Sequence, residues 1–217
     1  MILRATFDTT ATDLSLRARS LAAVNTPVLS AGAAKFGAKG LATSTGGYAY
    51  AVDAADAWLA KDFCMGAWVF NTAALPNGHI VFGDSDATIY VDMNDNGGLG
   101  TYVRAVAWAG GWSNLVEVNT RMIDPDFYLA DGVKYHLAFN RKGDRFNLFI
   151  DGILRGTALA PVAAMVLAST VTRTIGCGPD GSAALQGGID DVRITLADSV
   201  YGNVAFTAPT QAQPTSA

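Results

Sequence analysis

Short apolar stretches separated by turn signals recur about every 8–14 residues, and this spacing is the strongest constraint on the fold of the chain. Pairs such as Asn96-Gly97 and Asp151-Gly152 favour the positive φ angles of tight hairpins. Because short strands joined by hairpins pair in antiparallel sheets that each bury one face, about eleven of them predict a two-sheet antiparallel sandwich. The predicted strands are residues 2–7, 47–52, 63–70, 79–82, 88–93, 101–109, 115–122, 134–140, 145–150, 171–177 and 188–195.

The acidic residues support an all-β fold, since they are Asp with the single exception of Glu117. Glu favours helices, whereas Asp and Gly favour turns. We therefore expect at most one or two short helices, the first at residues 53–60 with Asp53 as its N-cap. Residues 159–168 are apolar without a clear period, and their structure stays open.

The sequence contains no internal repeat and no linker, so we expect one sandwich domain over residues 1–208. A Pro/Gln/Thr-rich extended tail is predicted at residues 209–217. From Phe206 onward the chain has little apolar surface to offset its ordering cost, and we expect it to be disordered on its own. Residues 13–30 lack a strand pattern and could form a surface loop. Either segment could order on a neighbouring subunit.

Charge and hydropathy exclude several classes of partner. The net charge of −4 and the scattered basic residues argue against nucleic acid as a partner. The N-terminus lacks a signal peptide, and the longest apolar stretch, at residues 159–168, is too short to cross a bilayer. We therefore expect synthesis in a cytoplasm and no membrane insertion. Cys64 and Cys177 lie in apolar stretches, which favours buried free thiols over a disulfide.

Three motifs resemble those of laminin-G-like, concanavalin A-like lectin domains. They are FCMGAWV at residues 63–69, the hairpin YHLAFNRKGDRFNLFIDG at residues 135–152 and GIDDVRI at residues 188–194. The resemblance implies a concanavalin A-like jelly roll with Trp68 in its core and with Asp190 and Asp191 capping turns or pairing with Arg193. The framework residues that it implies are Trp68, His136, Asp151, Gly152, Asp190, Asp191 and Arg193.

A narrower resemblance is to the version of this domain in virion proteins of tailed bacteriophages. It rests on Phe7-Asp8, on KFG at residues 35–37, and on Tyr201 followed by FTAPT at residues 206–210. In that version an Arg precedes the Tyr, whereas this chain has Val200. The resemblance implies a virion protein that is assembled in the host cytoplasm.

No catalytic residues are predicted. Glycoside hydrolases of this fold carry Glu-x-Asp-x-x-Glu on one strand, because a retaining mechanism needs two carboxyl groups about 5–5.5 Å apart. That motif does not occur here, and Glu117 has no acidic neighbour in the sequence.

Calcium is the one candidate cofactor, and none is required by the fold. Asp92, Asn94 and Asn96 match the first half of a calcium loop, but the twelfth position is Val103 where a bidentate Glu is needed. The simpler interpretation is a solvated hairpin loop that turns at Asn96-Gly97. Asp84 and Asp86 form a second acidic segment that is open to the same two interpretations.

Candidate contact residues surround one predicted turn. Trp108 and Trp112 flank Ala-Gly-Gly, and Asn114 follows at once, while Tyr102 lies on the preceding strand. Flat aromatic faces with amide oxygens suit sugar rings, but Trp is also enriched at protein interfaces and can cover the edge of a core.

We therefore expect a non-enzymatic virion surface protein: a capsid decoration, head-fibre or tail-fibre subunit. Its expected partners are other virion subunits, further copies of itself and host surface glycans. A dedicated carbohydrate-binding lectin or adhesin is the alternative, and a glycoside hydrolase of the same fold follows behind, since this fold hosts all three.

Overall fold

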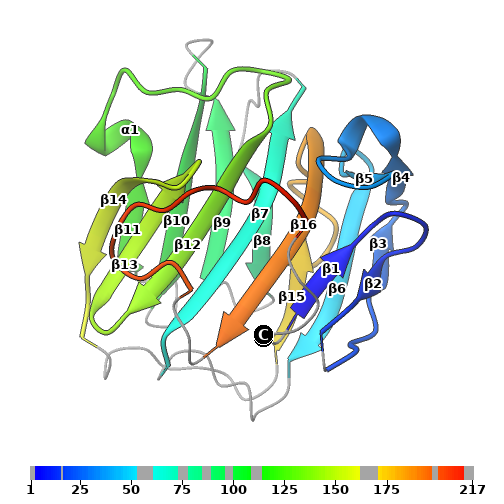
Figure 1. Ribbon diagram of the computed structural model, residues 1–217, viewed down its shortest axis with the longest axis horizontal. Helices are drawn as coiled ribbons and strands as arrows, with labels where there is room; N and C mark the ends of the chain where they lie inside the picture. Colours follow the sequence, from blue (N-terminus) through cyan, green and yellow to red (C-terminus); the bar gives the residue numbers. More distant parts are fainter. Residues whose placement is uncertain are drawn as a thin grey trace.

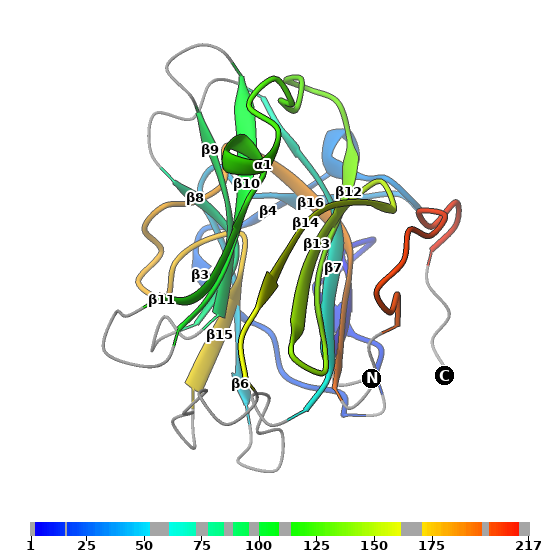
Figure 2. The same cartoon turned by 90° about the vertical axis from the view of Figure 1, so that its left-hand side faces the viewer.

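Two antiparallel sheets pack face to face in the computed structural model of the chain (Figures 1 and 2). This arrangement confirms the predicted all-β sandwich. Helical structure among the described residues is limited to α1 (Thr120–Ile123) and the 3-10 turn η1 (Ala31–Ala33). The structure describes residues 3–15, 17–52, 61–72, 78–84, 89–95, 100–108, 114–161, 171–196 and 200–212.

The first sheet, sheet A, has nine strands within these residues, in the order β14-β13-β12-β7-β16-β1-β2, with β5 paired to β16 and β4 paired to β5. The central strand β16 pairs with β7 on one side and with the N-terminal β1 on the other. The strands are β1 (Leu3–Thr6), β2 (Thr12–Asp13), β4 (Val28–Ser30), β5 (Gly40–Ala42), β7 (Phe63–Asn71), β12 (Tyr135–Lys142), β13 (Arg145–Ile150), β14 (Ile153–Leu159) and β16 (Gly187–Leu196).

The second sheet, sheet B, has seven strands within the same residues, in the order β11-β10-β9-β8-β15-β6-β3. Hairpins join β8, β9, β10 and β11 as sequence neighbours, and all of these pairs are antiparallel. The strands are β3 (Ala22–Asn25), β6 (Gly46–Val52), β8 (His79–Asp84), β9 (Ile89–Asp95), β10 (Thr101–Trp108), β11 (Asn114–Asn119) and β15 (Val171–Ile175).

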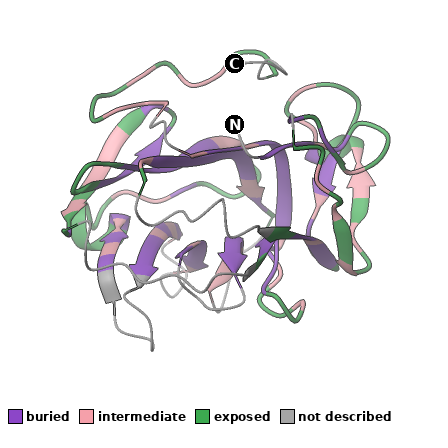
Figure 3. Cartoon of the chain, turned by 90° about the horizontal axis from the view of Figure 1, so that it is seen from below, coloured by how far each residue is buried: buried purple, intermediate pink, exposed green. Residues whose placement is uncertain are grey.

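The hydrophobic core lies between the sheets. Successive side chains of a strand point to opposite faces, so every second residue of a central strand is buried against the other sheet. Figure 3 shows the buried residues in purple along both layers. The core residues include Phe63, Met65, Ala67 and Val69 of β7, Ile89, Val91 and Met93 of β9, and Val103, Ala105 and Ala107 of β10.

All eleven predicted strands are present, and all but the strand at residues 145–150 have shifted ends. The strand predicted at residues 115–122 ends at Asn119, because the Asn119 side chain accepts a hydrogen bond from Arg121 N and caps α1. Five strands were not predicted. Four of them, β2, β3, β4 and β5, have two to four residues each, too few to show a period of two. The fifth, β14, is an edge strand with little buried surface. The helix predicted at residues 53–60 lies outside the described residues.

The segment expected to be a surface loop, residues 13–30, instead contributes β2, β3 and β4 to the two sheets. Cys64 and Cys177 are free and buried, as the sequence favoured.

A third layer covers the outer face of sheet A. Residues 200–212, called the C-terminal segment below, cross this face over β12 and β7 (Figures 1 and 2). Tyr201 and Phe206 of the segment lie against His136 and Phe149. The expectation of disorder from Phe206 onward is therefore wrong for Phe206 itself, because the outer face offers apolar side chains that the sequence did not reveal.

Trp68 belongs to this outer layer and not to the core between the sheets. It alternates with the inward residues Ala67 and Val69 of β7, so its ring points away from sheet B. The ring is nevertheless only 7% exposed, packed by Phe36 and His136. Trp68 is therefore buried as expected, but by the outer layer and not by the core between the sheets, because the resemblance marks a buried position without saying which face of the strand buries it.

Candidate functional site

The outer face of sheet B carries a row of polar and aromatic side chains. On β9 and β10 the inward residues are small or aliphatic, and the residues between them are polar or aromatic except for the buried Val106. The register sets Asp92 opposite Arg104 and Asn94 opposite Tyr102, and it sets Asn119 of β11 on the other side of Arg104. The set is called the polar face below and comprises Tyr90, Asp92, Asn94, Tyr102, Arg104, Glu117 and Asn119.

An ion pair with two hydrogen bonds lies at the centre of the polar face. Arg104 Nε donates to Asp92 Oδ1 at 3.1 Å, and Arg104 Nη2 donates to Asp92 Oδ2 at 2.6 Å. Asp92 is 3% exposed, and burial raises its pKa although the guanidinium opposes that shift. In turn the hydrogen bonds that Arg104 donates to Asp92 raise the pKa of Arg104. The parallel hydrogen bonds fix the plane of the guanidinium.

Aromatic rings border this pair. The Arg104 guanidinium carbon lies 5.3 Å from the centroid of the Tyr90 ring, and the Arg121 guanidinium lies 6.0 Å from the centroid of the Tyr102 ring. Both tyrosines are half-buried. On β11, Asn119 Nδ2 donates to Glu117 Oε1 at 3.2 Å. The polar face therefore offers fixed donors, acceptors and ring faces over three adjacent strands.

The backbone at Gly78 closely approaches the polar face. A Cβ atom placed there would lie 2.8 Å from Asn94 Oδ1 and 3.0 Å from Asp92 Oδ2. Any side chain at residue 78 would therefore push on the two oxygens that line this part of the polar face.

The structure does not bring all the predicted contact residues together. Tyr102 is part of the polar face near the start of β10, whereas the backbone positions of Trp108 and Asn114 lie opposite each other at the other end of the β10–β11 pair, next to a register shift. Trp112 lies outside the described residues. Tyr90, Arg104, Glu117 and Asn119 were not predicted, although the alternation in YVDMN and in YVRA could have placed the polar residues on one face.

The segment considered for calcium is a strand and not a loop up to Asp95, because β9 continues through it. Both Asp92 oxygens already accept hydrogen bonds from Arg104, and Asn96 lies outside the described residues. In the described part of the chain, no group of three His, Cys, Asp or Glu side chains is arranged to hold a metal ion. Calcium at Asp92, Asn94 and Asn96 stays a prediction.

The second acidic segment is also different from a solvated loop. Asp84 Oδ2 accepts a hydrogen bond from Arg173 Nη1 at 3.0 Å, and both side chains are buried. Asp86 lies outside the described residues.

The framework residue His136 of β12 contacts the turn that follows β13, and this contact fixes the backbone of the turn. Asp151 and Gly152 have φ angles of 51° and 77°, and Asp151 Oδ1 accepts from His136 N at 2.8 Å. Burial lowers the pKa of His136 to about 4, so its imidazole is neutral at pH 7.

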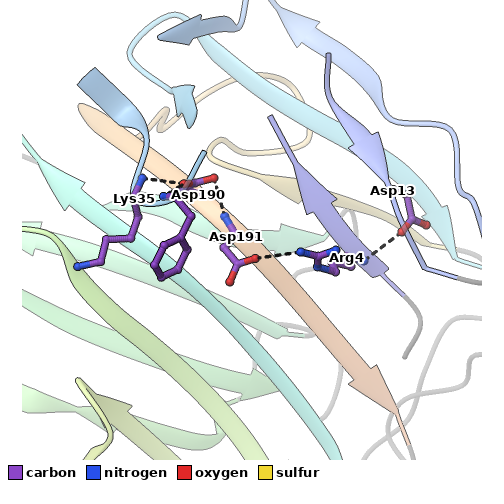
Figure 4. Close-up of polar contacts among 6 residues, drawn as sticks. Arg4, Asp13, Lys35, Asp190 and Asp191 are labelled. Carbon is purple, nitrogen blue, oxygen red and sulfur yellow. Dashed lines mark hydrogen bonds and ion pairs between the residues drawn. The ribbon is translucent and has the colours of Figure 1, made fainter. Parts of the chain in front are cut away.

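The framework aspartates lie at a bulge of β16. Asp190 Oδ2 accepts from Lys35 N at 2.7 Å and from Phe36 N at 2.9 Å, while Asp191 lies 3.9 Å from Arg4 (Figure 4). Asp190 and Arg193 flank the register shift of the bulge, within which Asp191 has a φ of 48°. Asp190 thus ties the segment after η1 to the outer face of sheet A.

Residues 43–196 match the concanavalin A-like lectin/glucanases superfamily. Comparison of the sequence with curated proteins gives no match. None of the helices within the described residues has the length and apolar character needed to span a bilayer.

Solved structures with the same architecture include binding domains at low sequence identity. Domain 4 of the arabinanase AbnA from Geobacillus stearothermophilus, solved with arabinotriose, is 17% identical with a TM-score of 0.62, covering 89% of this chain and 90% of that one. Botulinum neurotoxin type C, which needs two ganglioside molecules for entering cells, is 13% identical with a TM-score of 0.65, covering 89% and 47%. The binding domain of botulinum neurotoxin DC with rat synaptotagmin II is 11% identical with a TM-score of 0.61, covering 89% and 47%. This chain thus spans about half of each neurotoxin chain.

Proposed function

The chain belongs to the concanavalin A-like lectin/glucanases superfamily, and from that premise we propose that it is a non-enzymatic carbohydrate-binding protein that uses the polar face of sheet B. The observation that carries this proposal is the Asp92–Arg104 pair set between tyrosine rings on the two neighbouring strands β9 and β10. Binding sites for small ligands combine apolar or aromatic surface with a few oriented polar groups. A sugar presents both C–H faces and hydroxyl groups, and the polar face has a counterpart for each.

A binding role is favoured over hydrolysis by the state of the carboxylates. Glycoside hydrolysis needs one carboxyl group to donate a proton and a second to act as base or nucleophile. On the polar face Asp92 is engaged by the Arg104 guanidinium through both oxygens, and Glu117 accepts from Asn119. Neither carboxylate is presented to a substrate in the manner that this reaction requires.

We further infer a place for the protein on the surface of a bacteriophage particle, as a capsid decoration, head-fibre or tail-fibre subunit with capsid or tail proteins and further copies of itself as partners. The support is the phage-like segment FTAPT at residues 206–210, which lies on the outer face of sheet A, opposite the polar face. A dedicated lectin or adhesin is the alternative.

A glycan array tests the binding role. The purified protein is compared with Tyr102→Ala, with Arg104→Lys and with the control Arg145→Lys, an exposed arginine on β13 of the other sheet. We expect the wild type and the control to bind the same glycans and the two polar-face variants to bind at least about tenfold more weakly. Absence of any glycan binding, or equal binding by all four proteins, would overturn the assignment of the polar face.

Electron microscopy of assembled particles with a labelled antibody against the protein tests the second inference. Regular labelling of heads or tails is expected. Particles that lack the protein would leave the dedicated lectin as the remaining interpretation.

A further inference from the structure

A cavity lies on the opposite side of the molecule from the polar face. It has a volume of about 620 Å³ and lies between the outer face of sheet A and the C-terminal segment. This volume falls in the range of about 300–1,000 Å³ that is usual for small-molecule sites. The cavity, called the C-terminal cavity below, is lined by Lys35, Trp68, Lys134, Asp151, Thr207, Ala208, Pro209 and Thr210.

Two ammonium groups line this cavity without a carboxylate partner. Lys35 Nζ lies 3.7 Å from the centroid of the Trp68 ring, and Lys134 Nζ donates to the carbonyl oxygen of Ala34. Within the described residues, neither lysine forms an ion pair. An ammonium group has three N–H donors, so both lysines keep donors for a ligand.

The other polar groups of the cavity can form hydrogen bonds with the hydroxyl groups of a ligand. Asp151 supplies the one carboxylate of the lining, and its Oδ1 already accepts from His136 N. Thr207 and Thr210 add hydroxyl groups from the C-terminal segment. The lining thus carries two positive charges and one negative charge, a balance that favours a ligand with a single negative charge over a dianion such as phosphate.

Trp68 adds an aromatic ring to the wall. The residue is 7% exposed, and its buried Nε1 has no hydrogen-bond partner within the described residues. A buried N–H that lacks an acceptor is disfavoured. The part of Trp68 that a ligand meets is therefore its ring, over which the Lys35 ammonium lies.

The walls are held in place before any ligand arrives. Asp190 accepts the backbone N–H groups of Lys35 and Phe36, as Figure 4 shows, and so fixes the segment that carries the lysine. On the opposite wall, Phe206 N donates to Gly152 O at 2.9 Å and anchors the C-terminal segment. Such pre-organisation reduces the entropy lost on binding.

We propose that the C-terminal cavity binds an acidic sugar residue, of the uronic or sialic acid class. Its carboxylate lies between Lys35 and Lys134, and its hydroxyl groups contact Asp151, Thr207 and Thr210. This inference goes beyond the proposed function, because the cavity lies on the other face of the sandwich and shares no residue with the polar face.

Nuclear magnetic resonance titration of the full chain tests this assignment. The probes are sodium glucuronate, galacturonate and N-acetylneuraminate, with glucose and sodium acetate as controls for the sugar ring alone and the carboxylate alone. We expect saturable shifts for at least one acidic sugar, including the indole N–H of Trp68, at an affinity at least about tenfold above glucose and acetate. No saturable shift with any acidic sugar, or equal binding of acetate, would overturn the proposal.

Lysine variants test whether the acidic sugar binds in the C-terminal cavity. Lys35→Met with Lys134→Met should weaken binding of the acidic sugar at least about tenfold, whereas the matched control Lys39→Met, from the same segment but outside the lining, should change it less than about twofold. Arg104→Lys should leave it unchanged, which separates this site from the polar face. Unchanged binding by the double lysine variant, with a spectrum that shows a folded protein, would contradict the assignment.

Discussion

The ring of Phe206 stacks on the ring of Tyr201, with centroids 3.7 Å apart and an interplanar angle of 7°. Both rings meet His136 edge-on, at 5.8 and 5.9 Å between centroids. The C-terminal segment therefore covers the one histidine of β12 with its own aromatic pair.

Phe206→Ala should destabilise the fold by about 2 kcal/mol, since a half-buried ring loses part of the contact energy of a fully buried one. The matched control Val204→Ala removes an exposed side chain of the same segment and should cost less than about 0.5 kcal/mol. Urea unfolding measures both. Equal effects of the two variants would show that the aromatic pair does not hold the segment.

The stability of the protein should fall between pH 6.5 and pH 4 through His136. Burial lowers its pKa to about 4 in the folded state, so the unfolded state binds a proton first as the pH falls. The free energy of unfolding is unaffected by protonation of His136 above about pH 6.5 and falls by about 3 kcal/mol between there and pH 4. Urea unfolding of the wild type and of His136→Gln over this range isolates the contribution. Parallel pH profiles of the two proteins would contradict it.

Arg104→Met should destabilise the protein by about 3 kcal/mol, because it leaves the buried Asp92 carboxylate without its cation. Adding Asp92→Asn should recover most of the loss, since no unpaired charge is then buried. The control Arg145→Met should stay within about 0.5 kcal/mol of the wild type. A double variant as unstable as the single one would show that the charge of Asp92 is not the cause.

Calcium should bind weakly at Asp92, Asn94 and Asn96, with a Kd of about 10⁻⁴–10⁻³ M, because the site lacks a bidentate Glu and Asp92 already binds Arg104. A ligand that binds only the folded state raises the melting temperature by mass action. Arg104→Met frees the Asp92 oxygens and should increase the shift caused by calcium. Identical melting curves with chelator and with excess calcium, for both proteins, would show that calcium does not bind the folded protein.

Deleting residues 209–217 should leave the melting temperature of the isolated protein nearly unchanged, because the anchoring contacts at Phe206 and Gly152 precede the deletion. Incorporation into particles should decrease if the tail orders on a neighbouring subunit. Particle composition by gel electrophoresis and calorimetry of the isolated protein measure the two effects. Loss of folding would show that the tail is part of the sandwich, and normal incorporation would move the attachment to another face.

Much of the fold followed from local patterns. The strands at β7, β12, β13 and β16 carry strong apolar alternation and turn residues, so the sequence predicted each of them. The short strands β2 to β5 form because the long strands beside them provide partners, and a segment of two to four residues cannot show this in its own sequence.

The two candidate sites were predictable to different degrees. The polar face follows from the period-two pattern in β9 and β10, of which only Tyr102, Asp92 and Asn94 were selected. The C-terminal cavity brings together residues near positions 35, 68, 134, 151 and 207–210. No short-range pattern connects these positions, because their contact depends on the order of strands in sheet A and on the path of the C-terminal segment.

The position of β16 has a consequence for how the chain folds during synthesis. Sheet A joins β7 to β1 only through β16, which contains residues 187–196. Until these residues leave the ribosome, β1 and β7 lack the strand that joins them in sheet A, although β15 can already join β6 to β8 in sheet B. The pairing of Leu3 with Ile194 is a contact of very high sequence separation, and such contacts slow folding. Sheet A can therefore be completed only late in translation, when β16 is available to both β1 and β7.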